Sequence, residues 1–318
     1  MRVGMSSVFV FPGQGSQYVG MGRELAENFN EARLTFEEVN DALGQNLTKI
    51  MFEGPDKDLN MTENTQPALM AMSMAIFNIL KVHGGLDIRS KISFAAGHSL
   101  GEYSALCATG ALELSQTAKL LKIRGQAMQA AVPFGKGAMA AVLGLDYQAV
   151  KEIACSVSNH EICQAANDNS PGQVVVSGHA GAVDRAVVLA GEKGARKTVL
   201  LPVSAPFHCS LMAPAAQKMA NALADINIRP PIVPVVSNVT ARAETDPNVI
   251  RRLLVDQITY TVRWRESIEW IVSQGAERFY EIGAGKVLTG LVKKINKEVS
   301  CEPVSSTEQI DSLMQAIQ

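Results

Sequence analysis

Cysteine is scarce in this sequence of 318 residues. The five cysteines stand at positions 107, 155, 163, 209 and 301, and no two of them have C-x-x-C spacing. Disulfide frameworks use even numbers of cysteines, and structural zinc sites use closely spaced ones. The pattern therefore predicts reduced thiols, no metal site, and a location in a cytosol-like compartment, the cytoplasm.

Long apolar runs and basic blocks are lacking as well. The longest apolar stretch, residues 67–80, is interrupted by Ser73 and Asn78 and is too short to span a bilayer. The first seven residues lead into an expected strand at 8–11 and contain no apolar signal region. The 29 basic residues nearly balance the 31 acidic ones, for a net charge of -2. We therefore expect neither a membrane nor a nucleic acid as a partner.

The sequence does contain alternating strand-like and helix-like segments. This alternation predicts an α/β fold with a mainly parallel sheet, and the length favours one large domain with an insertion. Residues 134–203 follow the order βαββαβ, which is the ferredoxin-like arrangement. We therefore predict an α/β-hydrolase-like large domain, residues 1–133 and 204–318, with a ferredoxin-like small domain inserted at 134–203.

Two polar segments are expected to be loops. The first, residues 51–64, contains Gly54 and Pro55 and precedes an expected buried helix at 66–82. The second, residues 167–172, separates two expected strands of the insertion, at 162–166 and 174–178.

A nucleophile-elbow pattern stands at Gly97-His98-Ser99-Leu100-Gly101. It follows an apolar, strand-like run at 92–96 and precedes a helix-like segment at 102–108. G-x-S-x-G between a strand and a helix places the serine on a sharp turn, where its hydroxyl is exposed. The free N–H groups of the new helix would stabilise an oxyanion there. The pattern predicts Ser99 as the nucleophile.

A serine hydroxyl needs a base to take its proton. Of the five histidines, His98 is the immediate neighbour of Ser99, and successive side chains at a strand end diverge. His83 ends a helix, while His160 and His179 lie in the insertion. His208 lies where the chain returns to the large domain, and elimination makes it the predicted base.

An acidic third member of a triad is not evident. The α/β-hydrolase order is serine, acid, histidine, and the aspartates between Ser99 and His208 all lie in the insertion. Glu102 and Glu113 lie on the nucleophile's own helix or just beyond it. We therefore predict a Ser–His dyad, with the histidine oriented by a backbone carbonyl or an amide side chain. Such a dyad suits a thioester, because a thiolate is a good leaving group.

Two further features have alternative interpretations on residue pattern alone. The glycine-rich turn at 12–17 is either a plain strand-to-helix connection or a turn whose backbone N–H faces the active site. Arg124 lies in an apolar-rich helix-like segment at 114–132 and is either a solvated surface charge or a bidentate ligand for a carboxylate.

Four motifs, taken in order along the chain, resemble those of the malonyl-CoA:acyl carrier protein transacylases. This family includes the acyltransferase domains of fatty-acid and polyketide synthases, and the resemblance covers essentially the whole chain. The motifs are Gly13-Gln14-Gly15-Ser16-Gln17, Gly97-His98-Ser99-Leu100-Gly101-Glu102-Tyr103, Ile123-Arg124-Gly125 and Pro206-Phe207-His208.

The resemblance implies roles for the matching residues. Ser99 would carry the acyl group as an ester, His208 would act as general base and acid, and Arg124 would hold the malonyl carboxylate. The backbone N–H groups of Gln14 and Leu100 would form the oxyanion hole.

Three more positions follow from the same resemblance. Gln257 would line the site and help to hold the histidine and the oxyanion hole. Phe207, before the histidine, is similar to the residue of malonyl-selective members, as is Leu100 after the serine. Asn167, expected in a loop of the small domain, would border the substrate.

The resemblance implies transfer of malonyl from malonyl-CoA to the phosphopantetheine thiol of an acyl carrier protein. The reaction would follow ping-pong kinetics through a malonyl-serine ester, supply fatty-acid elongation, and use malonyl-CoA as substrate without a bound cofactor. Alternatives are a stand-alone acyltransferase serving a polyketide synthase, a serine thioesterase with water as acceptor, and a non-catalytic scaffold.

Overall fold

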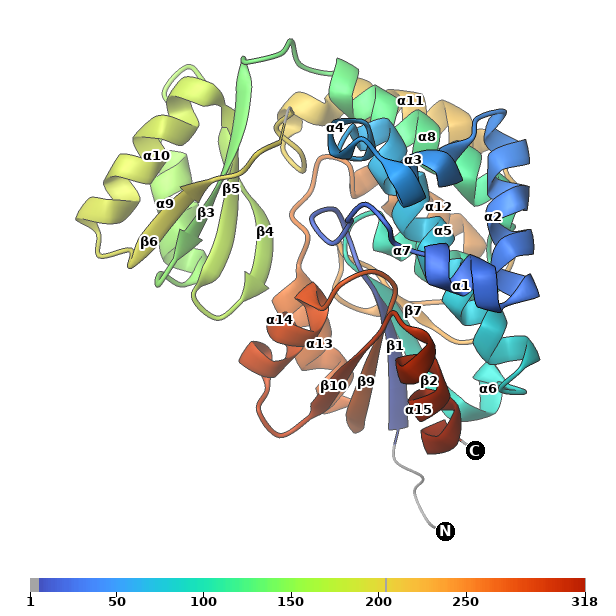
Figure 1. The fold of residues 1–318 in the computed structure, drawn as a ribbon. Coiled ribbons are helices and arrows are strands. Elements are labelled where there is room, and N and C mark those ends of the chain that lie inside the picture. Colours follow the sequence, from blue (N-terminus) through green and yellow to red (C-terminus); the bar gives the residue numbers. More distant parts are fainter. Residues whose placement is uncertain (1–5, 204, 318) are drawn as a thin grey trace.

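The computed structural model describes residues 6–203 and 205–317 and contains two separate β-sheets (Figure 1). Residues 1–5, expected to lack a signal region, and Ser204, the predicted start of the second large-domain segment, lie outside the described residues. The larger sheet has the strand order β10-β9-β1-β2-β7-β8. Its strands are β1 (Ser6–Phe11), β2 (Ile92–Gly97), β7 (Val235–Val236), β8 (Ala243–Glu244), β9 (Ala276–Ile282) and β10 (Ser300–Val304).

The larger sheet is parallel except for β8, which runs antiparallel to β7. Its central strand β1 is buried on both faces, because successive side chains point to opposite sides of a strand. Phe9 and Phe11 enter one hydrophobic core, and Val8 and Val10 enter another. A strand that is covered on both faces reads as an unbroken apolar run, as expected for a parallel sheet. The predicted α/β class is confirmed.

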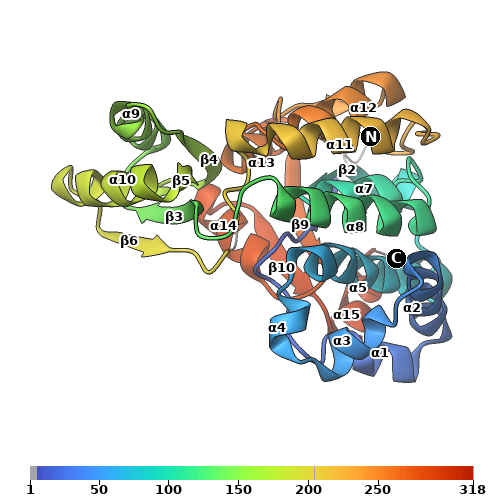
Figure 2. The ribbon, with the colours of Figure 1, turned by 90° about the horizontal axis from the view of Figure 1, so that it is seen from above.

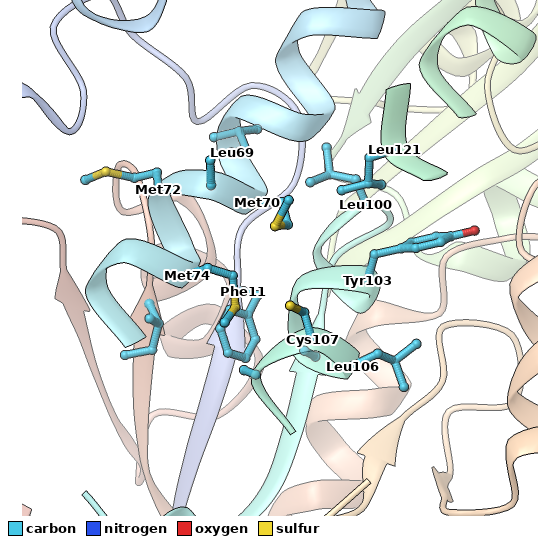
Figure 3. Close-up of a cluster of buried hydrophobic side chains, with 14 of the residues drawn as sticks. Phe11, Leu69, Met70, Met72, Met74, Leu100, Tyr103, Leu106, Cys107 and Leu121 are labelled. Carbon is cyan, nitrogen blue, oxygen red and sulfur yellow. The ribbon is translucent and has the colours of Figure 1, made fainter. Parts of the chain in front are cut away.

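The first of these cores is built by most of the helices. They are α1 (Arg23–Asn28), α2 (Asn30–Leu43), α3 (Leu47–Glu53), α4 (Asp56–Leu59), α5 (Thr62–Val82), α6 (Ile88–Lys91), α7 (Gly101–Ala108), α8 (Leu114–Ala130), α11 (Ala213–Ala224), α12 (Pro247–Asp256) and α15 (Thr307–Ile317). Figure 3 shows apolar side chains of α5 facing those of α7, with Phe11 between the two helices. The opposite core is covered by α13 (Trp264–Ser273) and α14 (Val287–Ile295).

The segment at 51–64, predicted to be a loop, is largely helical. It contains the end of α3, all of α4 and the start of α5. Two polar side chains near the start of α5 complete backbone hydrogen bonds: Thr65 Oγ1 donates to the carbonyl of Leu59 (2.6 Å), and Asn64 Nδ2 donates to that of Asp58 (2.8 Å). At this end of the segment polarity reflects buried hydrogen bonding, whereas Glu53, Asp56, Lys57 and Asn60 are exposed.

The smaller sheet is antiparallel, with the order β4-β5-β3-β6. Its elements follow the predicted βαββαβ order: β3 (Gly137–Leu143), α9 (Tyr147–Val157), β4 (Cys163–Ser170), β5 (Gln173–His179), α10 (Ala180–Glu192) and β6 (Lys197–Leu200). Figure 2 shows this sheet and its two helices as a lobe beside the rest of the chain. A separate hydrophobic core fills it.

Asn167 lies in strand β4, and its predicted placement in a loop is wrong. The strand continues to Ser170 because the segment before α13 pairs with it. The Asp168 N–H donates to the carbonyl of Val262 (2.9 Å), and the Val262 N–H donates to that of Ala166 (2.8 Å). The buried Asp168 carboxylate also forms an ion pair with Arg265 of α13 (2.8 Å). These contacts connect the smaller sheet to the larger lobe.

The described residues contain no helix that is long and apolar enough to cross a membrane.

Replacement of Gly97 by alanine should destabilise the fold severely. Gly97 ends β2 and Gly101 begins α7, and a Cβ atom on Gly97 would lie 1.9 Å from the carbonyl carbon of Gly101. Because that neighbour is backbone and cannot move aside, we expect G97A to lower the free energy of unfolding by about 3 kcal/mol or more in urea titrations.

Gly290 of α14 offers a matched control, because a Cβ atom there would contact nothing within 4 Å. G290A should raise the free energy of unfolding by roughly 0.5–1 kcal/mol through helix propensity. Equal stability of G97A and the unaltered protein would contradict the close approach.

Candidate active site

The candidate site lies at the carboxyl ends of the neighbouring strands β1 and β2, where α/β sheets commonly bind ligands (Figure 1). The two strands end in register, with Phe11 beside Gly97. The His98 N–H donates to the carbonyl of Phe11 (3.0 Å). This register places the turn that contains Gln14 beside the elbow that contains Ser99.

Ser99 occupies the left-handed region of backbone conformation, with φ of 53°. A non-glycine residue costs about 1–3 kcal/mol there, and such strain is concentrated at functional sites. His208, on the connection from β6 to α11, is also left-handed, with φ of 57°. The Ser99 hydroxyl donates to Nε2 of His208 over 2.8 Å.

The other ring nitrogen determines the state of His208. Its Nδ1 donates to the backbone carbonyl of Gln257 (2.9 Å), and since a carbonyl only accepts, the proton stays on Nδ1. Burial, together with the positive charge of Arg124, lowers the pKa of His208 to about 3. The imidazole is therefore neutral near pH 7, with the lone pair of Nε2 directed at the serine. No side-chain carboxylate in the described part of the chain bonds to its ring.

Arg124 is buried beside the serine, with 1% of its surface exposed. Its Nη2 donates to Ser99 Oγ (3.1 Å) and to Oε1 of Gln257 (2.8 Å), and its Nη1 donates to Oε1 of Gln66 (2.8 Å). Among the described residues, no carboxylate forms an ion pair with it, and its buried Nε has no hydrogen-bond partner. A buried guanidinium held by neutral groups can accept a carboxylate from a ligand.

Gln257 connects the other groups of the site. Besides its contacts with His208 and Arg124, its Nε2 donates to the backbone carbonyl of Ser99 (3.0 Å) and to Oε2 of Glu102 (2.8 Å). Glu102 is itself buried, and desolvation raises its pKa to about 7. The carboxylate next to the elbow therefore supports the glutamine and does not contact the histidine.

These groups surround a cavity of about 150 Å³ between the two sheets. Seven of the eight predicted site residues line it, and Gln257 lies behind them; the seven are Gln14, Ser99, Leu100, Arg124, Asn167, Phe207 and His208. The N–H groups of Gln14 and Leu100 donate to none of the described residues. Sequence reasoning missed other lining residues: Gln66, Met128, Met139, Asn169, Val175, Leu201 and Val203.

His98 also borders the cavity but is engaged elsewhere. Its Nε2 donates to Oδ1 of Asn169 in β4 (2.8 Å), so this histidine connects the elbow to the smaller sheet. Burial lowers the pKa of His98. Its ring is thus a neutral hydrogen-bond donor between the lobes, which fits its exclusion as the base.

The fold and this site place the protein among the acyl transferases, and a family model described as "Acyl transferase domain" matches residues 8–315. A malonyl CoA-acyl carrier protein transacylase of Bacillus subtilis is 44% identical over 310 residues, which cover 97% of this chain and 96% of the relative. The chain therefore belongs to the acyl transferase family, among relatives that are malonyl CoA-acyl carrier protein transacylases.

Solved structures agree with this assignment. An acyl-carrier-protein S-malonyltransferase from Bartonella henselae has 53% identity and a TM-score of 0.96, with 98% of this chain and 99% of that chain covered. A malonyl-transacylase in complex with its type II polyketide synthase acyl-carrier protein has 42% identity and a TM-score of 0.94, with 98% and 99% covered.

The pH dependence of serine reactivity should reflect the buried histidine. Because the pKa of His208 lies near 3 and not near its ordinary 6.5, this predicted base stays neutral in mild acid. We expect the rate of Ser99 labelling by a fluorophosphonate to stay constant from about pH 8 down to about pH 5.

Glu102, with a pKa of about 7, could add its own step to this profile. The measurement should therefore be repeated in E102Q, where that titration is removed. An acidic limb near pH 6.5 that persists in E102Q would contradict the neutral, buried base.

Proposed function

We propose that this protein transfers malonyl from malonyl-CoA to the phosphopantetheine thiol of an acyl carrier protein through a malonyl ester on Ser99. The observation that carries the proposal is the buried Arg124, which lacks a carboxylate partner among the described residues and donates to the same serine oxygen that donates to His208. A free carboxylate on the acyl group would supply the missing partner. Curated relatives named malonyl CoA-acyl carrier protein transacylase support the same donor and acceptor.

In the first half-reaction, the Ser99 proton moves to Nε2 of His208 as Oγ attacks the thioester carbonyl carbon. The resulting oxyanion accepts from the N–H groups of Gln14 and Leu100, which donate to none of the described residues. Loss of one such donor typically costs a factor of about 10²–10³ in rate. The carbon–sulfur bond then breaks, and the coenzyme A thiolate takes the proton from His208.

The second half-reaction repeats these steps with a different nucleophile. His208 takes the proton of the phosphopantetheine thiol, whose sulfur attacks the ester carbonyl. Ser99 leaves and recovers its proton from His208. The imidazole of His208 is neutral at the start and at the end of each half-reaction. A dyad without a carboxylate therefore suffices for exchange between two thioesters.

The remaining residues hold the acyl group and the machinery. Arg124 would bind the malonyl carboxylate, and Gln257 holds both Arg124 and His208. Phe207 and Asn167 border the cavity on opposite lobes, and its small volume favours a short acyl chain.

A second acceptor has specific support. A structural relative was solved with its type II polyketide synthase acyl-carrier protein. The acceptor here could therefore be a polyketide carrier instead of a fatty-acid one, with the same chemistry at Ser99. A transfer assay that pairs malonyl-, methylmalonyl- and acetyl-CoA with carriers of both kinds distinguishes the two, and malonyl-CoA hydrolysis without carrier measures any thioesterase activity.

We further propose that residues 134–203 form a small domain inserted between residues 1–133 and 204–318. The smaller sheet and its hydrophobic core draw only on residues 137–200. We also propose a cytoplasmic location, supported by the free state of all five cysteines.

S99A should abolish the covalent intermediate. Without the Oγ nucleophile, incubation with malonyl-CoA should leave the mass of the protein unchanged in intact mass spectrometry, whereas the unaltered protein gains one malonyl group. A malonyl adduct that persists in S99A would move the nucleophile to another residue.

R124A should impair malonyl transfer selectively. A hydrogen-bonded contact with a charged group contributes about 1.5–3 kcal/mol, so kcat/KM for malonyl-CoA should fall roughly 10- to 100-fold while acetyl transfer changes little. R124K keeps the positive charge but lacks the planar guanidinium, which can donate two parallel hydrogen bonds to a carboxylate, so it should give an intermediate loss. Equal losses for the malonyl and acetyl substrates would exclude the carboxylate-binding role.

A further inference from the structure

Asn238, a residue outside the predicted site, contacts the nucleophile elbow directly. It follows β7, which pairs with β2 through Ala95–Val235 and Ala96–Val236. Oδ1 of Asn238 accepts from the Ser99 N–H (2.8 Å), and its Nδ2 donates to the carbonyl of Gly97 (2.7 Å). A side-chain amide carries the same donor and acceptor as a peptide group, so Asn238 extends the pairing of β7 beyond the end of that strand.

The elbow needs such a partner. The left-handed turn at Ser99 takes its own N–H and the carbonyl of Gly97 out of both the sheet and the following helix. Buried backbone groups without partners are costly, and a left-handed serine persists only where its surroundings hold it. The Asn238 side chain bonds to both the Ser99 N–H and the Gly97 carbonyl, and so holds the chain on either side of the left-handed turn.

Asn238 is itself held firmly, with 1% of its surface exposed. Its N–H donates to Oε2 of Glu102 (3.0 Å), and its carbonyl accepts from the Arg263 N–H (3.0 Å). Its Oδ1 also accepts from Nε2 of Gln257 (3.2 Å). The side chain therefore links the backbone of the serine to the glutamine that orients His208.

We propose that Asn238 is a positioning residue that holds Ser99 in its left-handed conformation and so aligns Oγ with His208 Nε2. The proposal rests on the assigned role of Ser99 as nucleophile. Asn238 contacts the backbone of Ser99 and none of the groups that react, so it should affect the rate of acylation and not the binding of malonyl-CoA.

N238A and N238D test this role. N238D keeps the volume and one acceptor but places a second oxygen against the carbonyl of Gly97. Misalignment of a nucleophile can cost on the order of 10²-fold, so both variants should lower the acylation rate constant per active site roughly 10- to 100-fold. The Kd for malonyl-CoA, taken from the concentration dependence of single-turnover acylation, should change less than about threefold. N221A, which removes an exposed asparagine of α11, is the matched control and should change neither value.

Labelling by a fluorophosphonate, with the labelled fraction as active-site count, separates positioning from folding. A purely structural role would lower the melting temperature and the active fraction but leave the labelling rate constant of the folded molecules unchanged, and that result in both variants would overturn the proposal. A rise in that Kd with an unchanged acylation rate constant would overturn it too. If N238A does not fold, the labelling rate constant of N238D alone tests the proposal. Wild-type protein labelled by the fluorophosphonate but not by malonyl-CoA would count against the proposed function and not against this inference.

Discussion

The hydrogen bond from Ser99 to His208 Nε2 is the interaction on which the site depends. It joins residues 109 positions apart, and all four strands of the smaller sheet lie between them in the sequence. Both residues adopt left-handed backbone conformations, so neither position is held by its own regular element. The surrounding network therefore sets the alignment: Gln257 holds the imidazole, and Asn238 holds the backbone of the serine.

Burial gives this small network its chemical character. It keeps His208 neutral, raises the pKa of Glu102 to about 7, and leaves the Arg124 guanidinium among neutral oxygens. Each of these groups would have an ordinary protonation equilibrium in water. Inside the protein, the Ser99 hydroxyl lies within hydrogen-bond distance of both the Nε2 lone pair of His208 and the Arg124 guanidinium, which has no carboxylate partner among the described residues. Such a site is poised for an acyl group that carries its own negative charge.

Much of the fold and of the site could be predicted because short, local sequence patterns indicate them. The elbow has a fixed G-x-S-x-G spacing between strand and helix, and strand-like and helix-like segments predict the βαββαβ order of residues 137–200. His208 was reached by elimination among five histidines. Asn238 and Gln66 gave no such signal, because a polar residue in a turn or at a helix start is usually exposed, and only long-range packing buries these two.

The loop predictions failed for a related reason. Residues 51–64 and Asn167 lie in largely polar stretches, and polarity alone does not show that the chain there forms helices or pairs with a distant backbone segment. From the sequence alone we could predict the α/β class, the nucleophile elbow, a dyad without an acid, and the candidate arginine. The folded chain adds that Arg124 lies against Ser99, that a backbone carbonyl of Gln257 accepts from His208 where a triad would have an acid, and that Asn238 supports the elbow. These contacts join segments more than twenty residues apart, so long-range packing brings them together and no local pattern reveals them.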